Sequence, residues 1–185
     1  MADVKTPDDY RPDWKEYFMG LAISAAERAS CLRHQFGAAV EMNKILAGTG
    51  YNGFPRGYDS CYEQEICRKH SLGIEDGVKN TGNCFANHAE TNAVLHALAH
   101  TGTMLEGASL FSLGYPCSDC AKLIANTGID SVYYMLDYIE PDSQTRTIFE
   151  GRKPTVKLER LATPYLEARL DLMRRMRKGE FKSKD

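Results

Sequence analysis

The apolar residues of this chain recur with two different periods, and the longer period predicts three helices in its first two thirds. Over residues 14–29 apolar side chains return every three or four positions, and Asp13 with Glu16 three residues later is typical of a capped helix start. The same period returns over 87–100 and 118–126. We therefore expect helices in these three segments.

Short runs rich in β-branched and aromatic residues predict strands between and after these helices. They cover residues 36–40, 45–49, 109–113, 132–136 and 156–158, and the first two lie close enough to form a hairpin. Helical spacing returns over 144–149 and 165–176. Because strands alternate with helices in the second half of the chain, we expect an α/β layered domain with some parallel strand pairing.

The length of 185 residues suits one domain spanning 1–185. Residues 1–12 are polar and punctuated by prolines, which favours a loose N-terminal arm. Residues 58–86 are polar, contain glycines and hold three of the cysteines, so we expect an inserted loop that needs a function or a staple. Residues 164–185 are expected to form a C-terminal helix with a basic tail that is solvated.

The overall charge argues against a polynucleotide partner, because the net charge of −2 and the pI of about 6.2 leave no general basic excess. A mononucleotide needs only one or two local cations and is compatible with this balance. The start of the chain has no apolar segment of a secretion signal, and no apolar run is long enough for a membrane span. We therefore expect a cytoplasmic protein whose six cysteines are thiols used for metal binding or catalysis.

Two short motifs carry the chemistry: His88-Ala89-Glu90 and Pro116-Cys117-Ser118-Asp119-Cys120. His88, Cys117 and Cys120 supply three ligands for a tetrahedral zinc, which leaves one position open for water. Glu90 is placed to move protons on and off that water, and Asp119 is expected at the surface. The pattern H-x-E…P-C-x-x-C is typical of zinc deaminases that act on cytosine or adenine bases. A structural zinc site or coincidental cysteines would not explain the glutamate.

A longer series of motifs resembles the deoxycytidylate (dCMP) deaminases of the zinc-dependent cytidine and deoxycytidylate deaminase superfamily. In order along the chain, it comprises Trp14–Ala29, Phe36-Gly37-Ala38, Gly50-Tyr51-Asn52-Gly53-x-Pro55, His88-Ala89-Glu90-x-Asn92-Ala93 and Pro116-Cys117-x-x-Cys120-Ala121-Lys122. The resemblance implies a cytidine-deaminase-like three-layer fold, with a central mixed sheet of about five strands and helices on both faces. It also implies hydrolysis of dCMP to dUMP for thymidylate synthesis, and assembly into homo-oligomers, commonly hexamers.

The resemblance also implies which residues contact the substrate. Asn52 matches the asparagine that contacts the nucleoside, and Ala89 and Asn92 belong to the family's H-A-E-x-N-A run. Lys122 is the candidate for proximity to the phosphate, and Tyr138 matches an aromatic residue that some members place against the pyrimidine. Two alternatives stay open, since an Asn-Gly pair favours turns without any ligand and buried tyrosines are common in cores.

The chain departs from the family pattern over 139–143 and after residue 152, so the preference for the 5′ group and for ring substituents stays open. Members of the family are often activated by dCTP and inhibited by dTTP. The 53–57 loop would lie near such an effector site.

Four cysteines remain outside the catalytic motif: Cys31, Cys61, Cys67 and Cys84. In phage and bacterial members of the family a second zinc ties the end of the first helix to the inserted loop, and Cys31 and Cys61 match two of its ligand positions. Cys67 and Cys84 would complete a Cys₄ site, although His70 or His34 could replace one of them. Alternatively the four are small buried hydrophobes. His96 and His100, spaced for one helix face, are expected to be ordinary surface residues.

Two other functions compete with dCMP deamination. The first is zinc-dependent deamination of a different or modified nucleotide, or of tRNA adenosine, although a tRNA enzyme should present a basic surface. The second is a non-catalytic zinc-stabilised scaffold, which would have no use for Glu90.

Overall fold

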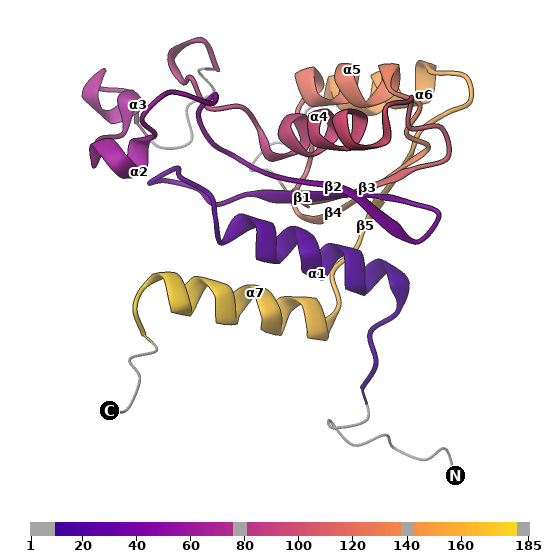
Figure 1. Ribbon diagram of the computed structural model, residues 1–185, viewed down its shortest axis with the longest axis horizontal. Helices are drawn as coiled ribbons and strands as arrows, with labels where there is room; N and C mark the ends of the chain where they lie inside the picture. The colour runs from indigo at the N-terminus through magenta and orange to yellow at the C-terminus, as the bar shows by residue number, and fades with distance from the viewer. Residues whose placement is uncertain (1–9, 76–80, 138–142, 181–185) are drawn as a thin grey trace.

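A five-stranded mixed sheet forms the centre of the computed structural model, which describes residues 10–75, 81–137 and 143–180 (Figure 1). The strands are β1 (Gly37–Met42), β2 (Ile45–Tyr51), β3 (Ser109–Gly114), β4 (Ser131–Leu136) and β5 (Lys157–Arg160). Their order is β2-β1-β3-β4-β5, with antiparallel pairing from β2 to β3 and parallel pairing from β3 to β5. The predicted mixed sheet is therefore confirmed.

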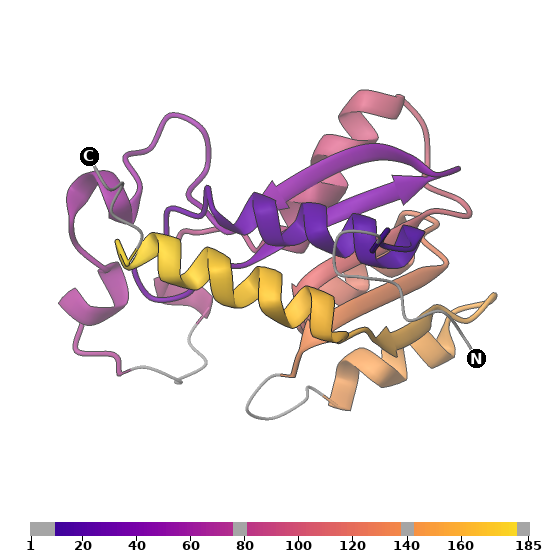
Figure 2. The ribbon, with the colours of Figure 1, turned by 90° about the horizontal axis from the view of Figure 1, so that it is seen from below.

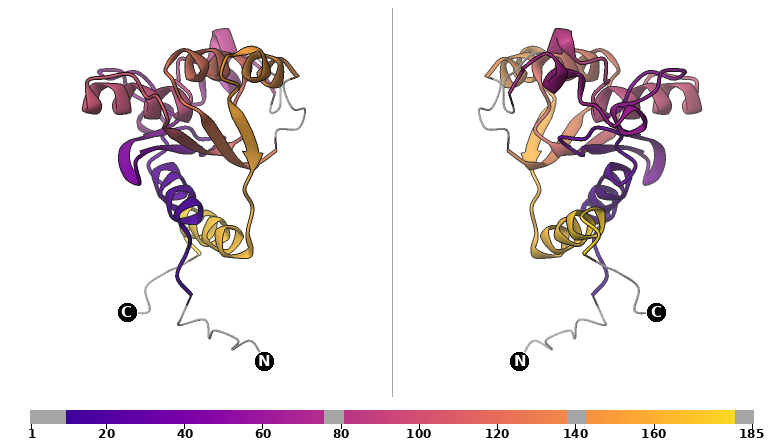
Figure 3. Two further views of the ribbon diagram at one scale, coloured as in Figure 1. Left: turned by 90° about the vertical axis from the view of Figure 1, so that its right-hand side faces the viewer. Right: turned by 90° about the vertical axis from the view of Figure 1, so that its left-hand side faces the viewer.

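Helices cover both faces of this sheet, which confirms the predicted three-layer arrangement (Figures 1 and 3). Three helices lie on one face: α4 (Ala89–Thr101), α5 (Ser118–Asn126) and α6 (Ser143–Gly151). The other face carries α1 (Trp14–Ala26) and α7 (Pro164–Arg177), which run side by side (Figure 2). Among the described residues, no helix is both long and apolar enough to cross a bilayer.

Local caps explain where the helices begin and end. The expected capping box starts α1, because Asp13 accepts a hydrogen bond from the backbone N–H of Glu16, whose side chain bonds back to the N–H of Asp13. The helix ends at Ala26, not at residue 29, because the next three amides bond to carbonyls only three positions back. Likewise α4 starts at Ala89, two residues later than expected, because Asn87 pairs with Gly53 in a β-bridge.

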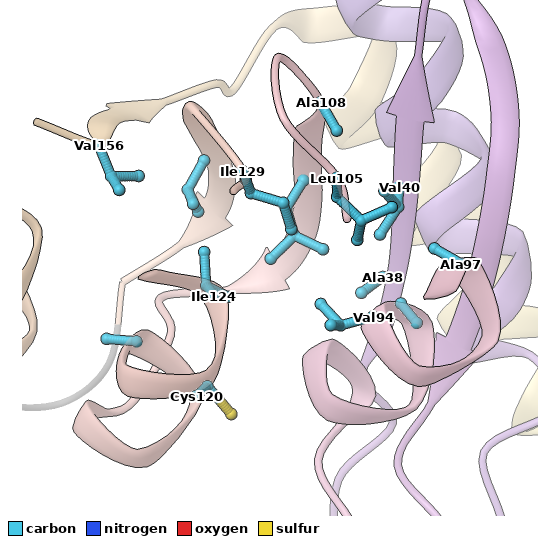
Figure 4. Packing of buried hydrophobic residues seen from close by; sticks show 14 of the residues in the cluster. Ala38, Val40, Val94, Ala97, Leu105, Ala108, Cys120, Ile124, Ile129 and Val156 are labelled. Atoms are coloured by element: carbon cyan, nitrogen blue, oxygen red, sulfur yellow. The ribbon is translucent and has the colours of Figure 1, made fainter. Parts of the chain in front are cut away.

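The main core lies between the sheet and the α4/α5 layer, where side chains such as Val40, Val94, Leu105, Ile124 and Ile129 converge (Figure 4). All of these side chains are fully buried. A second apolar cluster, built around aromatic and methionine side chains of α1, β3 and β4, fills the space between the sheet and α1/α7.

Small residues let α4 lie directly on β2. A Cβ added to Gly50 would stand 2.2 Å from the backbone nitrogen of Ala93 and 2.4 Å from the carbonyl oxygen of Ala89. Neither backbone atom can move without shifting the helix, so only glycine fits here. This close contact fixes the height of the first turn of α4 above the sheet.

The inserted segment over 58–86 has more regular structure than expected. It contains two four-residue helices, α2 (Cys61–Gln64) and α3 (Arg68–Ser71), and the 3-10 turn Thr81–Asn83. A reciprocal cap between Ser60 and Glu63 explains the start of α2. The two helices lie together at one end of the molecule, beyond the sheet (Figure 2).

The two ends of the described chain meet at α1. Within the expected N-terminal arm, residues 1–9 lie outside the described residues, but Tyr10 packs on Tyr165 of α7 with ring centroids 5.1 Å apart. Its hydroxyl donates to the buried carboxylate of Glu16, which also accepts a 2.7 Å hydrogen bond from Thr163, the N-cap of α7. The predicted C-terminal helix is present as α7.

Candidate metal centre

The two predicted motifs meet where α4 and α5 begin. His88 is the N-cap residue of α4, Cys117 is the N-cap residue of α5, and Cys120 lies in the first turn of α5. The Nδ1 atom of His88 stands 3.4 Å from the sulfur of Cys117 and 3.4 Å from that of Cys120. Among the described residues, this is the one group of three or more potential ligand atoms that all lie within 4.8 Å of one another.

The backbone explains why these side chains face each other. His88 and Cys117 both have extended N-cap geometry, and neither uses its side chain to cap its own helix. Their imidazole and thiol are therefore left to the metal site. The free N–H groups of two helix N-termini also give this region positive potential, which favours thiolate over thiol.

The electrostatics of the three donors fit a metal that takes nitrogen and sulfur ligands. Hydrogen bonds from the thiol of Cys120 and from His88 lower the pKa of Cys117 to about 4, so this sulfur is a thiolate. The same contact with Cys117 raises the pKa of His88 to about 9. One imidazole and two sulfurs at contact distance are a donor set that suits zinc, which would displace the protons they share.

Glu90 lies beside this group and is buried, with 7% of the residue exposed. Its Oε1 atom accepts a 2.9 Å hydrogen bond from the hydroxyl of Ser112 on β3. Its Oε2 atom faces the other way and lies 3.8 Å from the sulfur of Cys120. Burial raises the pKa of Glu90, so this carboxyl group holds a proton more readily than an exposed glutamate does.

The two predicted asparagines are both bonded to backbone. Asn52 accepts from the N–H of Phe36 and donates to the carbonyl of His34, each at 2.8 Å. Asn92 donates to the carbonyl of Tyr51 at 2.8 Å. These bonds leave Asn52 with one N–H and one lone pair for a ligand, so both structural and binding roles remain open to it.

The other predicted substrate contacts lie in different surroundings. Ala89 is fully buried as the first residue of α4. Lys122 is exposed and forms a 3.0 Å ion pair with Asp119, which lies at the surface as expected. Tyr138 lies outside the described residues.

His96, predicted as an ordinary surface residue, is exposed and bonds through Nδ1 to the carbonyl of Thr49.

The four remaining cysteines, which we call the insertion cysteines (Cys31, Cys61, Cys67 and Cys84), gather in one region. The thiol of Cys61 interacts electrostatically with the other three, and its sulfur accepts a hydrogen bond from the backbone N–H of Arg68. Burial is the main reason that the pKa of Cys61 is raised. No three of these sulfurs lie within 4.8 Å of one another, so the cluster is more open than the group around His88.

Three residues near the centre were not predicted from the sequence. Ser112 bonds to Glu90 as described, Thr91 lies with its hydroxyl 3.7 Å from the sulfur of Cys120, and Thr145 of α6 donates a 2.9 Å hydrogen bond to the carbonyl of Pro116. Ser112 leaves a trace in the sequence, because it puts a hydroxyl between the apolar residues Phe111 and Leu113 in the middle of a strand. The two threonines leave none.

A cavity of about 240 Å³ lies away from this centre. It is lined by the ends of β4 and β5 and by α7, including Arg160 and Arg174, and none of the metal-centre residues contributes to its wall. This cavity is therefore separate from the candidate metal centre.

Comparisons with known proteins agree with this geometry. Residues 12–136 match the family model described as the cytidine and deoxycytidylate deaminase zinc-binding region. The deoxycytidylate deaminase of Mycobacterium phage D29 is 41% identical over 128 residues, covering 67% of this chain and 95% of that protein. The human deoxycytidylate deaminase is 35% identical over 150 residues, 78% of each chain.

A solved structure gives the same result for the fold. The dCMP deaminase from cyanophage S-TIM5, in complex with dCMP and dUMP, superposes with a TM-score of 0.63 at 29% identity. The match covers 82% of this chain and 99% of that one.

Proposed function

This chain belongs to the cytidine and deoxycytidylate deaminase family, and on that premise we propose that it hydrolyses dCMP to dUMP and ammonia. One observation carries the proposal: the buried carboxyl group of Glu90 lies against the His88, Cys117 and Cys120 donor set. A structural zinc site needs no such acid. The dUMP formed would supply thymidylate synthesis.

His88, Cys117 and Cys120 would hold the zinc ion. Bound there, zinc lowers the pKa of a coordinated water from about 15.7 to about 7, which amounts to on the order of 12 kcal/mol in forming hydroxide. Glu90 accepts a proton from the attacking water and delivers it to ring nitrogen N3 of the pyrimidine. The oxygen bonds to C4, the C4–N4 bond breaks, and the departing amine takes up the second proton of the water as ammonia.

The burial of Glu90 suits this role. A carboxyl group in contact with bulk water would exchange its proton with solvent, whereas one that is 7% exposed keeps it for the substrate. Its raised pKa also makes it a better base for the water proton than an ordinary glutamate.

The experiment that tests this proposal is a nucleotide panel with the purified zinc-loaded protein. Deamination is followed by separating the products formed from dC, dCMP, dCTP, CMP, 5-substituted dCMP and dAMP. We expect dCMP to be converted at least about tenfold more efficiently than the others, as for a site that reads both sugar and phosphate. Preference for another compound would reject the substrate assignment, and no turnover of any would favour a scaffold.

We further propose that the insertion cysteines hold a second, structural zinc. Support comes from their convergence around Cys61 and from the Arg68 N–H that donates to its sulfur, as expected for a thiolate ligand. A Cys₄ site would hold α2 and α3 to the end of α1, in a segment with few apolar contacts of its own. Metal analysis should return two zinc ions per chain, and one would reject this second site.

The remaining expectations concern the protein in its cell. None of the six cysteines forms a disulfide, which supports a reducing, cytoplasmic compartment. From the resemblance to deoxycytidylate deaminases we also expect a homo-oligomer, commonly a hexamer in that family, with dCTP and dTTP as effectors. Size-exclusion chromatography with light scattering tests the oligomeric state, and initial rates measured with dCTP or dTTP added test the effectors. A monomer whose rate changes with neither nucleotide would contradict both expectations.

A further inference from the structure

Ser112 is a polar residue in the most buried strand of the sheet. Its side chain is 0% exposed, at the centre of β3, where the strand pairs with Ala38 on one side and with Tyr134 on the other. Its neighbours Phe111 and Leu113 pack toward α1 and α7, and Leu110, two residues away, packs into the core under α4 and α5. Alternation along a strand therefore turns Ser112 toward α4.

A hydroxyl in this position must find a partner. Leaving a buried donor unpaired is costly, and an apolar side chain would fill the space without that cost. The hydroxyl of Ser112 donates its hydrogen bond to Oε1 of Glu90 at 2.9 Å, a charge-assisted bond whenever Glu90 is ionised. Serine therefore satisfies a hydrogen bond here that no apolar residue could supply.

The two oxygens of Glu90 are made different by this bond. Oε1 is held to the sheet by Ser112, while Oε2 points to the sulfur of Cys120, one of the three donors of the metal centre. A free glutamate side chain would rotate between these orientations and lose rotamer entropy each time it reacts. Anchored at Oε1, the carboxylate keeps Oε2 turned toward the reacting atoms.

We propose that Ser112 is a positioning residue for the deamination reaction: it fixes the carboxylate of Glu90 so that Oε2 faces the metal donors. The expected effect of Ser112 on turnover rests on the proposed function. The bond between Ser112 and Glu90 is independent of that function. Because β3 is the central strand and is hydrogen-bonded on both sides, the anchor stands on the interior of the sheet.

The test compares Ser112→Ala with Ser112→Thr, each assayed for kcat, KM and zinc content. Removing the hydroxyl should lower kcat by about 10- to 100-fold while KM changes less than about threefold, because the bond acts on the proton-transfer step. Zinc content should equal that of the wild type. Threonine keeps the hydroxyl and should restore kcat to within about fivefold of the wild type.

A matched control removes another buried hydroxyl, one in the helix layer that packs on the same face of the sheet. Thr127 is buried at the end of α5 and donates to the carbonyl of Ile124 at 2.9 Å, away from the metal centre. Thr127→Val should lower the melting temperature and leave kcat within about twofold of the wild type. If Ser112→Ala behaves like this control, Ser112 is merely structural and the proposal is overturned.

A double-mutant cycle separates this inference from the proposed function. The melting temperatures of Ser112→Ala, Glu90→Ala and the double variant are measured on zinc-loaded protein, because alanine removes the oxygen that accepts the bond. Coupling between the two sites supports the bond, and additive shifts overturn it. If the wild type deaminates no nucleotide, the proposed function fails, while the cycle still decides whether Ser112 anchors Glu90.

Discussion

The molecule contains two clusters of cysteines, and they differ in how far the protein alone assembles them. Around His88, the three donor atoms lie within 4.8 Å of one another, on the first turns of two helices packed against the sheet. The insertion cysteines approach one another around Cys61, but no three of them reach that spacing. Their segment contains helices of only four residues.

The difference follows from what each cluster stands on. The buried first turns of α4 and α5 are fixed by contact with β2 and by the main apolar core, so their ligands are held in place before a metal arrives. In the described part of the insertion, only Cys61 and Cys67 are buried apolar residues, too few to fix its shape, and a metal would have to supply that order. The first cluster suits catalysis and the second suits stability.

The largest contrast should come from removing one thiol from each cluster. Cys120→Ser should lose one zinc ion per chain and lower kcat/KM for dCMP at least about 10³-fold, because the nucleophile depends on that metal. Cys61→Ser should also lose one zinc ion but keep activity within about tenfold of the wild type, with faster proteolysis over residues 58–86. Metal analysis, initial rates and limited digestion check both results.

Two outcomes would contradict this contrast. If Cys61→Ser abolished turnover while remaining folded, the insertion would be part of the active site. If Cys120→Ser kept its zinc and its rate, the donor set around His88 would not be the catalytic centre.

Two glycine-to-alanine variants, one in β2 under α4 and one in the insertion, test the claim that close packing fixes the catalytic cluster. Gly50→Ala forces a Cβ to within 2.2 Å of the backbone of α4 and should destabilise the protein by about 3 kcal/mol, roughly 10 °C in melting temperature. It should also weaken zinc binding at the His88 centre. Gly82→Ala in the insertion meets no atom within 4 Å and should change neither property. Equal melting temperatures for the two variants would contradict the packing argument.

The smallest effect is expected at the α1/α7 contact, away from both clusters. Burial alone would raise the pKa of Glu16, but hydrogen bonds from Tyr10, Thr163 and the Asp13 backbone outweigh it and hold the pKa below its ordinary value of 4.5. A carboxylate with a lowered pKa stabilises the fold above its unfolded-state pKa, and this stabilisation is lost as the pH falls through the folded-state pKa.

Glu16→Gln should therefore lower the melting temperature at neutral pH and flatten its decline in acid. Thermal melts from about pH 7 to about pH 3.5 measure both, on the wild type and the variant. Zinc content and kcat at neutral pH should not change. A variant with the same acid slope as the wild type would exclude Glu16 as the source of that slope.

The regular parts of this fold follow from local sequence, because period, caps and strand composition act over a few residues. The capping box at Asp13 is of this kind. The pairing of His88 with Cys117 spans 29 residues and was predicted for another reason, because the two motifs together form a zinc-deaminase signature. The bond from Ser112 to Glu90 joins two elements 22 residues apart, so no local spacing predicts it. The helices of the insertion escaped prediction because each is a single turn, and only α2 has a side-chain cap at its start.

The contacts of the predicted substrate-binding residues could not be predicted from local sequence either. The amide of Asn52 bonds to the backbone of His34 and Phe36, and Lys122 pairs with Asp119, partners that only the folded chain reveals. Their roles in binding stay predictions until variants are assayed with dCMP.

The central claim is that Glu90 transfers protons beside a zinc ion that other residues hold. Its most direct test is to measure zinc content and dCMP turnover on one preparation of Glu90→Gln. The account predicts that zinc at the His88 centre is retained and that dUMP formation falls by at least about 10³-fold, beyond what loss of a stabilising contact explains. A zinc-loaded variant that still converts dCMP at near the wild-type rate would contradict it.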